Sequence, residues 1–291
     1  MFFAAVSAIS ASIIFAVALQ NLKTALTFLD DLSGTFISVA TLAIVLWLVG
    51  IWNIRWHYWS SDAVWYFIAA GALFPAMGQR FQIASVKHVG PALTAAFGAF
   101  LPLFATLPAV IFLGETVTPI QAAGIALLVS GLVLAALGRG QSWKTRAFYL
   151  ILLPLGAALV RAMTQPLSKA GYNILPEPMF AMIVFATVST MVIGAMVLQR
   201  GSAKGLLSFG KGHLLFAVNG LLIGAGILGI QLSLLMGSVT LTSSLVSTTP
   251  IWTLVFGVLF FKNETVYWWH GLVAVLVSVG AVMVVIGQAP H

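Results

Sequence analysis

Two stretches of the chain resemble each other and decide the fold. The first is residues 93–133, LTAAFGAFLPLFATLPAVIFLGETVTPIQAAGIALLVSGLV, and the second is residues 241–282, LTSSLVSTTPIWTLVFGVLFFKNETVYWWHGLVAVLVSVGAV. An offset of 148 residues aligns Leu93, Thr94, Pro102, Val110 and Phe112 with Leu241, Thr242, Pro250, Val258 and Phe260. A slip of one residue then aligns Glu115-Thr116-Val117 with Glu264-Thr265-Val266, and Gly131 with Gly280. Identities among apolar residues arise easily by chance, so the ordered set of Leu-Thr, proline and Glu-Thr-Val is what indicates an internal repeat.

The composition places this repeat in a membrane. Of 291 residues, 61% are hydrophobic and only 7% are charged, whereas soluble domains carry roughly 25% charged residues. The mean hydropathy is +1.09. So few charges exclude a cytosolic enzyme, a nucleic-acid-binding domain and a disordered chain. The net charge of +7 is too scattered to follow a phosphate backbone. The chain has no cysteine, which excludes disulfides and thiol chemistry.

The apolar stretches are long enough for ten membrane-spanning helices. A helical span needs about 20 apolar residues to cross the hydrocarbon core. The predicted spans are 2–20, 33–52, 64–86, 91–113, 118–138, 147–168, 179–199, 213–235, 240–261 and 267–287. The first one could be mistaken for a signal peptide, but it lacks a basic start and has only a weak cleavage site. We therefore expect an all-α integral membrane protein.

The repeat divides these ten spans into two sets of five. We expect residues 1–138 to form the first five-helix repeat, 139–146 to form a linker and 147–287 to form the second repeat. Because five is odd, the second copy enters the membrane in the opposite orientation. Inverted repeats are typical of secondary transporters, which bind substrate between the two repeats near the membrane midplane.

The layout resembles the EamA domain of the drug/metabolite transporter superfamily. The resemblance rests on five plus five spans and on a proline-containing fourth span that leads to Gly114-Glu115-Thr116, echoed by Pro250 and Asn263-Glu264-Thr265. Asn263 departs from the usual glycine. The resemblance implies a carrier of the bacterial inner membrane for amino acids, other metabolites or drugs, often an exporter. It also implies a central cavity lined by spans 1, 3, 4, 6, 8 and 9, and cytoplasmic termini.

The basic residues predict the opposite orientation. Nine lie in loops that follow odd-numbered spans: Lys23, Lys87, Arg139, Lys144, Arg146, Arg200, Lys204, Lys211 and Lys262. Only Arg55 and Lys169 follow even-numbered spans. The positive-inside rule therefore places the odd loops in the cytoplasm and both termini outside. We favour this charge count over the family's orientation.

Two arginines remain inside the spans. The six acidic residues all lie at span ends or in loops, which disfavours a proton-driven multidrug carrier with a buried carboxylate. Arg161 and Arg80 are therefore expected to meet a carbonyl, water or an anionic ligand. A guanidinium binds a carboxylate bidentately. The alternatives are that they snorkel to the interface or bond to the backbone.

A second set of polar residues accompanies these arginines. The candidates for substrate contact are Gln79, Gln82, Gln165, Asn219, Ser243, Ser247 and Trp252. Each amide could instead bond neighbouring helices together, and the hydroxyls could satisfy carbonyls that Pro250 leaves free. Pro102 and Pro250 are candidate hinges or gates, because proline inside a helix produces a kink.

The sequence thus predicts a secondary transporter of small metabolites. We expect an anionic or zwitterionic substrate such as an amino acid, alternating access at a central cavity, and export as the direction. A multidrug or lipophilic-cation exporter of the same fold and a non-transporting membrane scaffold are the alternatives. We expect no catalytic residues, no metal, no cofactor and no nucleic acid, since no catalytic or phosphate-binding motif is present. The partners are then the substrate and the lipid bilayer, with the protein a monomer or homodimer.

Overall fold

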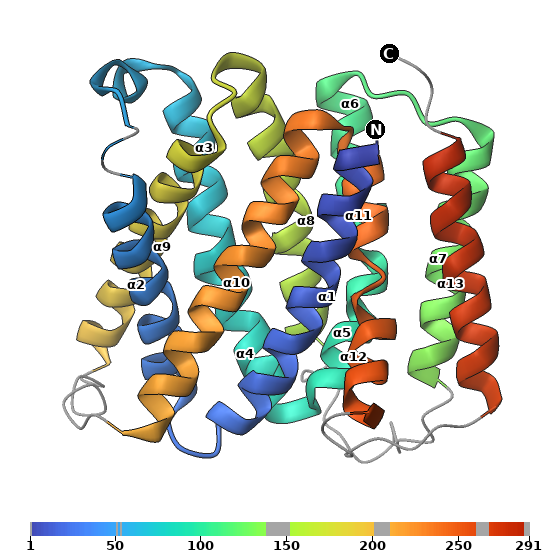
Figure 1. The fold of residues 1–291 in the computed structure, drawn as a ribbon, viewed down its shortest axis with the longest axis horizontal. Helices are drawn as coiled ribbons and strands as arrows, with labels where there is room; N and C mark the ends of the chain where they lie inside the picture. The colour runs from blue at the N-terminus through green and yellow to red at the C-terminus, as the bar shows by residue number, and fades with distance from the viewer. Residues whose placement is uncertain are drawn as a thin grey trace.

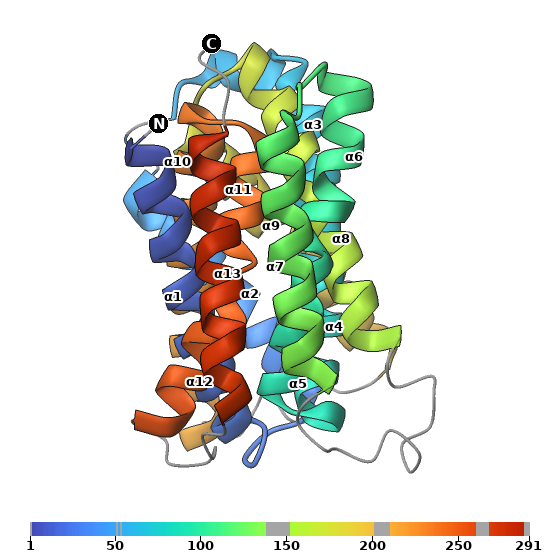
Figure 2. The ribbon, with the colours of Figure 1, turned by 90° about the vertical axis from the view of Figure 1, so that its right-hand side faces the viewer.

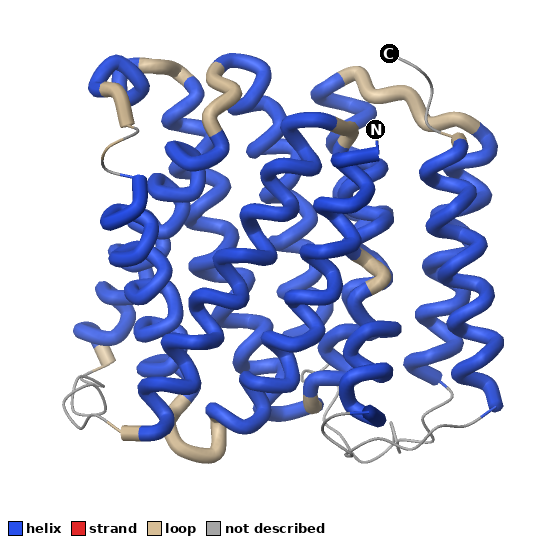
Figure 3. The backbone as a smooth tube through the Cα atoms, viewed as in Figure 1, coloured by secondary structure: helices blue, strands red, loops and turns tan. Residues whose placement is uncertain are grey.

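The computed structural model describes residues 2–50, 52, 54–137, 152–200, 210–259 and 268–287. Regular structure within these ranges is helical (Figure 3). The first half of the chain forms α1 (Phe2–Ala25), α2 (Asp31–Gly50), η1 (Trp56–Ser60), α3 (Ala63–Gly71), η2 (Ala72–Met77), α4 (Gly78–Val89), α5 (Pro91–Phe97), η3 (Gly98–Phe100), α6 (Leu101–Leu113) and α7 (Pro119–Leu137). The second half forms α8 (Leu152–Ile174), α9 (Pro178–Gln199), α10 (Lys211–Met236), α11 (Val239–Val246), α12 (Thr249–Leu259) and α13 (Trp268–Ile286).

These helices stand side by side as ten membrane-length columns in the described part of the chain (Figure 1). Three columns are broken, because α3, η2 and α4 form the third, α5, η3 and α6 the fourth, and α11 and α12 the ninth. The prediction of an all-helical protein with ten spans is confirmed. The start of α1 and the end of α13 lie at the same edge of the bundle, as an even number of spans requires (Figure 1). Which compartment this edge faces stays a prediction.

Matched contacts relate the two halves. The Ser85 Oγ and Thr94 Oγ1 atoms lie 2.7 Å apart, and the Ser233 Oγ and Thr242 Oγ1 atoms are also 2.7 Å apart. Each hydrogen bond joins the third span of its half to the fourth, and the two pairs differ by the 148 residues of the sequence offset. The same offset separates the starts of α5 and α11 and those of α6 and α12. The local geometry therefore follows the sequence repeat.

The two halves interleave. Helix α1 packs against α10, and α8 packs against α3 and α4, so the first span of each half contacts the third span of the other. Helices α7 and α13 pair along their length (Figure 2). The limits 1–138 and 147–287 for the repeats stay a prediction, and the linker 139–146 lies outside the described residues.

Glycines set the closest helix contacts. A Cβ atom on Gly220 of α10 would lie 2.2 Å from the backbone oxygen of Ser38 of α2. Ser38 Oγ donates a hydrogen bond to the Phe216 carbonyl over 2.8 Å in the same contact. Gly224 packs on Leu42 of α2, so Gly220 and Gly224 form a ridge of small residues that faces α2. The equivalent contact in the other half places Gly71 against Phe185.

The alanine face of α7 makes no such close contact. Ala122, Ala126 and Ser130 of α7 are exposed rather than packed against a neighbouring helix. The contact with α13 lies on the face of Gly124, whose Cβ atom would be 2.7 Å from the carbonyl oxygen of Gly280. Two opposed glycines let backbones approach more closely than alanines do, so the glycine face and not the alanine face meets the partner helix.

Two of the breaks lie beside the predicted hinge prolines. Pro102 and Pro250 lie in the first turn of α6 and α12, directly after the interruptions of the fourth and ninth spans. Both prolines thus lie where a second half-helix begins and where the missing N–H costs least. Their role as hinges or gates stays a prediction. A third break lies at Phe74, with φ −142° and ψ 128°. The following Pro75 accounts for it, because proline disfavours helical geometry in the residue before it.

Candidate functional site

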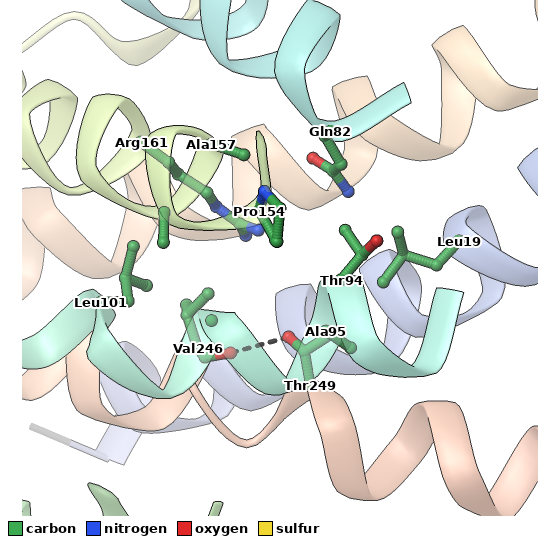
Figure 4. Close-up of a pocket in the computed structure, with 12 residues that line it drawn as sticks. Leu19, Gln82, Thr94, Ala95, Leu101, Pro154, Ala157, Arg161, Val246 and Thr249 are labelled. Carbon is green, nitrogen blue, oxygen red and sulfur yellow. Dashed lines mark hydrogen bonds between the residues drawn. The ribbon is translucent and has the colours of Figure 1, made fainter. Parts of the chain in front are cut away.

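A cavity lies between spans from both halves of the chain. It holds about 450 Å³ of empty space with its mouth included. Its lining residues are Leu19, Gln82, Thr94, Ala95, Gly98, Leu101, Pro154, Ala157, Ala158, Arg161, Val246 and Thr249 (Figure 4). They belong to spans 1, 3, 4, 6 and 9, which are five of the six that the family resemblance implies. The described part of the lining includes no residue of α10, the eighth span.

The cavity lies toward one end of the bundle. Leu19 stands in the C-terminal part of α1, and Pro154 stands near the N-terminal end of α8. Thr94 belongs to α5, the first segment of the fourth span. These helix ends gather at the edge opposite the chain termini (Figure 1).

Arg161 is the charged residue of the described lining. Its guanidinium carbon lies 3.9 Å from the centroid of the Phe15 ring and 5.6 Å from that of Phe74. The Nε and Nη2 atoms are buried and find no hydrogen-bond acceptor among the described residues. Aromatic faces attract the positive charge but leave the guanidinium N–H groups without an oxygen. The side chain reaches from α8 toward the cavity (Figure 4). Its geometry therefore suits an anionic ligand.

Neutral polar groups complete the lining. Gln82 brings an amide from α4, and Thr94 and Thr249 bring hydroxyls from α5 and α12. Each threonine hydroxyl donates to a carbonyl of its own span, Thr94 to Gly90 over 2.8 Å and Thr249 to Val246 over 2.7 Å (Figure 4). The Thr249 oxygen keeps its lone pairs as acceptors, whereas the Thr94 oxygen also accepts from Ser85 Oγ and keeps only one. Of the predicted contact residues, the structure thus brings Arg161 and Gln82 together.

Two other predicted glutamines lie deeper in the bundle. Gln165 follows Arg161 by four residues on α8, and both its amide oxygen and its amide nitrogen are buried without a partner among the described residues. Gln79 stands three residues before Gln82 on α4, and its amide nitrogen is likewise unpartnered. Neither residue lines the cavity. Polar atoms without a partner among the described residues therefore lie beyond the cavity lining on both α8 and α4.

The remaining candidates are bonded to the backbone or stand apart. Asn219 donates to the Ala18 carbonyl over 2.8 Å, Ser243 to that of Thr240 over 3.2 Å and Ser247 to that of Ser244 over 2.6 Å. This is the alternative in which polar side chains satisfy carbonyls. Trp252 is half-buried and is not among the lining residues. Their contribution to substrate binding stays a prediction.

Arg80 has a carboxylate partner. Its Nη1 atom bonds the Asp31 carboxylate at the start of α2, and Lys87 Nζ lies 3.1 Å from the same group. The sequence placed Asp31 at a span end but carried no indication that the end of the third span meets the start of the second. The ion pair directs Arg80 toward the edge of the bundle. Binding of Asp31 is therefore an alternative to the predicted role of Arg80 in substrate contact.

This ion pair can be tested by a double-mutant cycle. We expect Arg80→Gln and Asp31→Asn each to lower the free energy of unfolding by about 1 kcal/mol, since the two side chains are only 21% and 17% exposed. The double variant should cost less than the sum of the two. Thermal unfolding in detergent measures all three. Additive losses would show that the residues do not interact, and a loss of ligand binding in Arg80→Gln alone would restore its substrate role.

The sequence reasoning did not single out some residues of the site. Phe15 and Phe74 cover Arg161, and Thr94 and Thr249 supply the hydroxyls. Thr94 could have been found from the aligned Leu-Thr pair of the repeat. Phe15 carries no such indication, because an aromatic residue in an apolar span looks the same whether it faces lipid or an arginine. No group of three or more potential metal ligands occurs among the described residues.

Comparison with known proteins agrees with this arrangement. The EamA-like transporter family matches residues 2–137. This likeness covers the first five spans, which make up slightly less than half of the chain.

A solved structure shares the fold along the whole chain. It is described only as the crystal structure of a protein, and it superposes with a TM-score of 0.73 at 15% sequence identity. The match covers 97% of this chain and 95% of that chain. At this identity the likeness shows the fold alone. No curated protein matches the chain. The likeness to the EamA-like transporter family thus rests on residues 2–137.

Proposed function

We propose that this EamA-like protein is a secondary transporter of small carboxylate-bearing metabolites, with amino acids as the leading class. The observation that carries the proposal is Arg161, a guanidinium at the cavity with two buried N–H-bearing nitrogens and no acceptor among the described residues. Hydrogen bonds to charged groups contribute about 1.5–3 kcal/mol each. A carboxylate of the substrate would provide the missing acceptors.

The rest of the cavity supports a small zwitterion. None of the described lining residues is acidic, so the cavity lacks the carboxylate that would attract a cationic drug. The hydroxyl and amide oxygens of Thr94, Thr249 and Gln82 are acceptors for an ammonium group.

Alternating access is the proposed mechanism. The cavity occupies one end of the bundle, and the breaks in the third, fourth and ninth spans lie around it. Half-helices joined at such breaks could tilt without unfolding the rest of the bundle. Export, location in the bacterial inner membrane and a monomeric or homodimeric state are proposals that rest on the family resemblance. The charge count supports termini outside.

Ligand-dependent thermal stability of the purified protein tests the substrate class. We expect amino acids to raise the unfolding temperature, because a ligand at 100 times its Kd adds about 2.7 kcal/mol to the stability of the folded state. Each amino acid is paired with its own amide, which has the same side chain and ammonium group but no carboxylate. We expect the amides to have no effect.

The other outcomes decide against the proposal. Stabilisation by lipophilic cations alone would favour a multidrug exporter. Equal effects of an amino acid and its amide would show that the carboxylate is not recognised. If no amino acid, organic acid, phosphorylated metabolite or cation stabilises the protein, and proteoliposomes take up none of them, the scaffold alternative would be favoured.

A further inference from the structure

Glu115 joins the two halves of the chain at the end of the bundle that lies away from the cavity. It follows α6 after Gly114, which has a φ of +68°. Its carboxylate accepts hydrogen bonds from the backbone nitrogens of Val239 (2.6 Å) and Thr240 (3.1 Å) and from Thr240 Oγ1 (2.9 Å). These residues begin α11. A helix start has free N–H groups and a partial positive charge, so a carboxylate stabilises it.

Lys169 of α8 holds the other side of the same turn. Its ammonium donates to the carbonyls of Leu234 (2.7 Å) and Gly237 (2.8 Å), where α10 ends. A cation at the end of a helix complements the exposed carbonyls there. Glu115 and Lys169 line a second pocket with Asn173, of about 740 Å³ with its opening included. One residue from each half of the chain therefore fixes the α10–α11 turn.

Helix α8 connects this turn to the cavity. Lys169 lies eight residues beyond Arg161, or about 12 Å along the helix. Gln165 stands between them, with both polar atoms of its amide buried and unpartnered among the described residues. Buried polar groups are nearly always satisfied, so groups left without a partner in one state indicate a path that a ligand or water occupies in another.

We propose that the contact of Glu115 with the start of α11 is the gate at this end of the transport path, and that substrate passes it along the Arg161–Gln165–Lys169 face of α8. In this structure the gate is closed while the cavity lies at the opposite end. Alternating access then requires the three hydrogen bonds of Glu115 to break in the other state. The path rests on the proposed function, whereas the gate is testable without any substrate.

Because the chain contains no cysteine, a single introduced cysteine is the only thiol that can be labelled. Ser168, next to Lys169 on α8, is fully buried. Ser168→Cys replaces one oxygen atom by sulfur, and the labelling rate of this thiol reports whether water-soluble reagents reach it. We expect a water-soluble maleimide to label Ser168→Cys slowly, and at least tenfold faster when Glu115→Gln is added. Glutamine replaces one acceptor oxygen by an NH₂ group that cannot accept from the helix N–H groups. Thr240→Val, which removes one of the three bonds, should give a smaller increase.

Glu177→Gln is the matched control. Glu177 precedes α9 at the same edge of the bundle and accepts from Tyr58 over 3.0 Å, outside the proposed gate. We expect it to leave the labelling rate within twofold. Unchanged labelling in Glu115→Gln, or equal acceleration in Glu177→Gln, would overturn the gate. If Glu115→Gln does not fold, Glu115→Asp replaces it, with the same comparison.

Ligand binding separates the gate from the transport function. We expect Glu115→Gln to keep the stabilisation by amino acids, because Glu115 does not line the cavity, while its transport rate in proteoliposomes changes at least fivefold. Accelerated labelling with no ligand effect in any variant would leave the gate supported and overturn the substrate proposal. Normal labelling together with loss of ligand stabilisation would place Glu115 in binding and overturn the gate.

Discussion

Arg161→Ala is expected to abolish both the stabilisation by carboxylate ligands and their transport, while the protein folds with unchanged or higher stability. The loss follows from the two buried guanidinium nitrogens, which the proposed ligand alone would satisfy. At about 1.5–3 kcal/mol for each charged hydrogen bond, losing a bidentate contact weakens binding by at least about 100-fold. Ligand-dependent thermal unfolding and uptake into proteoliposomes measure the two effects.

The unchanged or higher stability that we expect of Arg161→Ala follows from the cost of burying a charge. Placing an arginine in a membrane helix costs about 2.5–3.5 kcal/mol on the insertion scale. The contacts with the Phe15 and Phe74 rings return about 2 kcal/mol. The balance favours removal of the charge, so a purely structural arginine would not be expected at this position without another partner. A drop in the unfolding temperature of Arg161→Ala would show that the residue has such a partner.

Two controls accompany the variant. Arg161→Lys keeps the charge but lacks the planar fork, so we expect weakened binding with the same preference for carboxylates. Lys23→Ala removes an exposed cation at the end of α1 and should leave binding unchanged. Loss of binding in Lys23→Ala would mean that overall charge, and not the contact in the cavity, attracts the ligand.

Much of the fold could be predicted from the sequence because span length and hydropathy are properties of local stretches. The offset between Pro102 and Pro250 located both broken spans. Whether these prolines act as hinges could not be predicted, since a proline at the start of a half-helix looks the same in sequence as one inside a continuous helix. The break at Phe74 has no counterpart in the repeat that would have drawn attention to it.

The site was less predictable because it depends on which helix faces meet. A buried arginine could be identified from Arg161 alone, since charge in an apolar span is rare. The partner of Arg80 could not, because Asp31 is distant in sequence and comes close only when α2 and α4 pack. The same limit applies to Glu115. Its motif was visible as part of the resemblance, but its bonds to Val239 and Thr240 required the three-dimensional structure.

Gly220→Ala is expected to destabilise the bundle strongly, although it adds only one methyl group. In an exposed helix this change would stabilise by about 1 kcal/mol. In α10 the new Cβ atom would lie 2.2 Å from a backbone oxygen, that of Ser38, which cannot move aside without shifting α2. Separating the helices also weakens the bond from Ser38 to Phe216. Because overpacking costs about 1–3 kcal/mol, we expect a loss of about 3 kcal/mol, at the upper end of that range.

Two further glycine-to-alanine variants test whether the steric contact causes the loss of stability. Gly224→Ala meets the Leu42 Cδ1 atom, the flexible end of a side chain, and should cost less than Gly220→Ala. Gly210→Ala has no neighbouring atom within 4 Å and should be neutral or slightly stabilising. Thermal unfolding in one detergent ranks the three variants. If Gly220→Ala is as stable as Gly210→Ala, α2 and α10 do not approach within backbone contact, and the interleaving of the two halves through this contact would have to be abandoned.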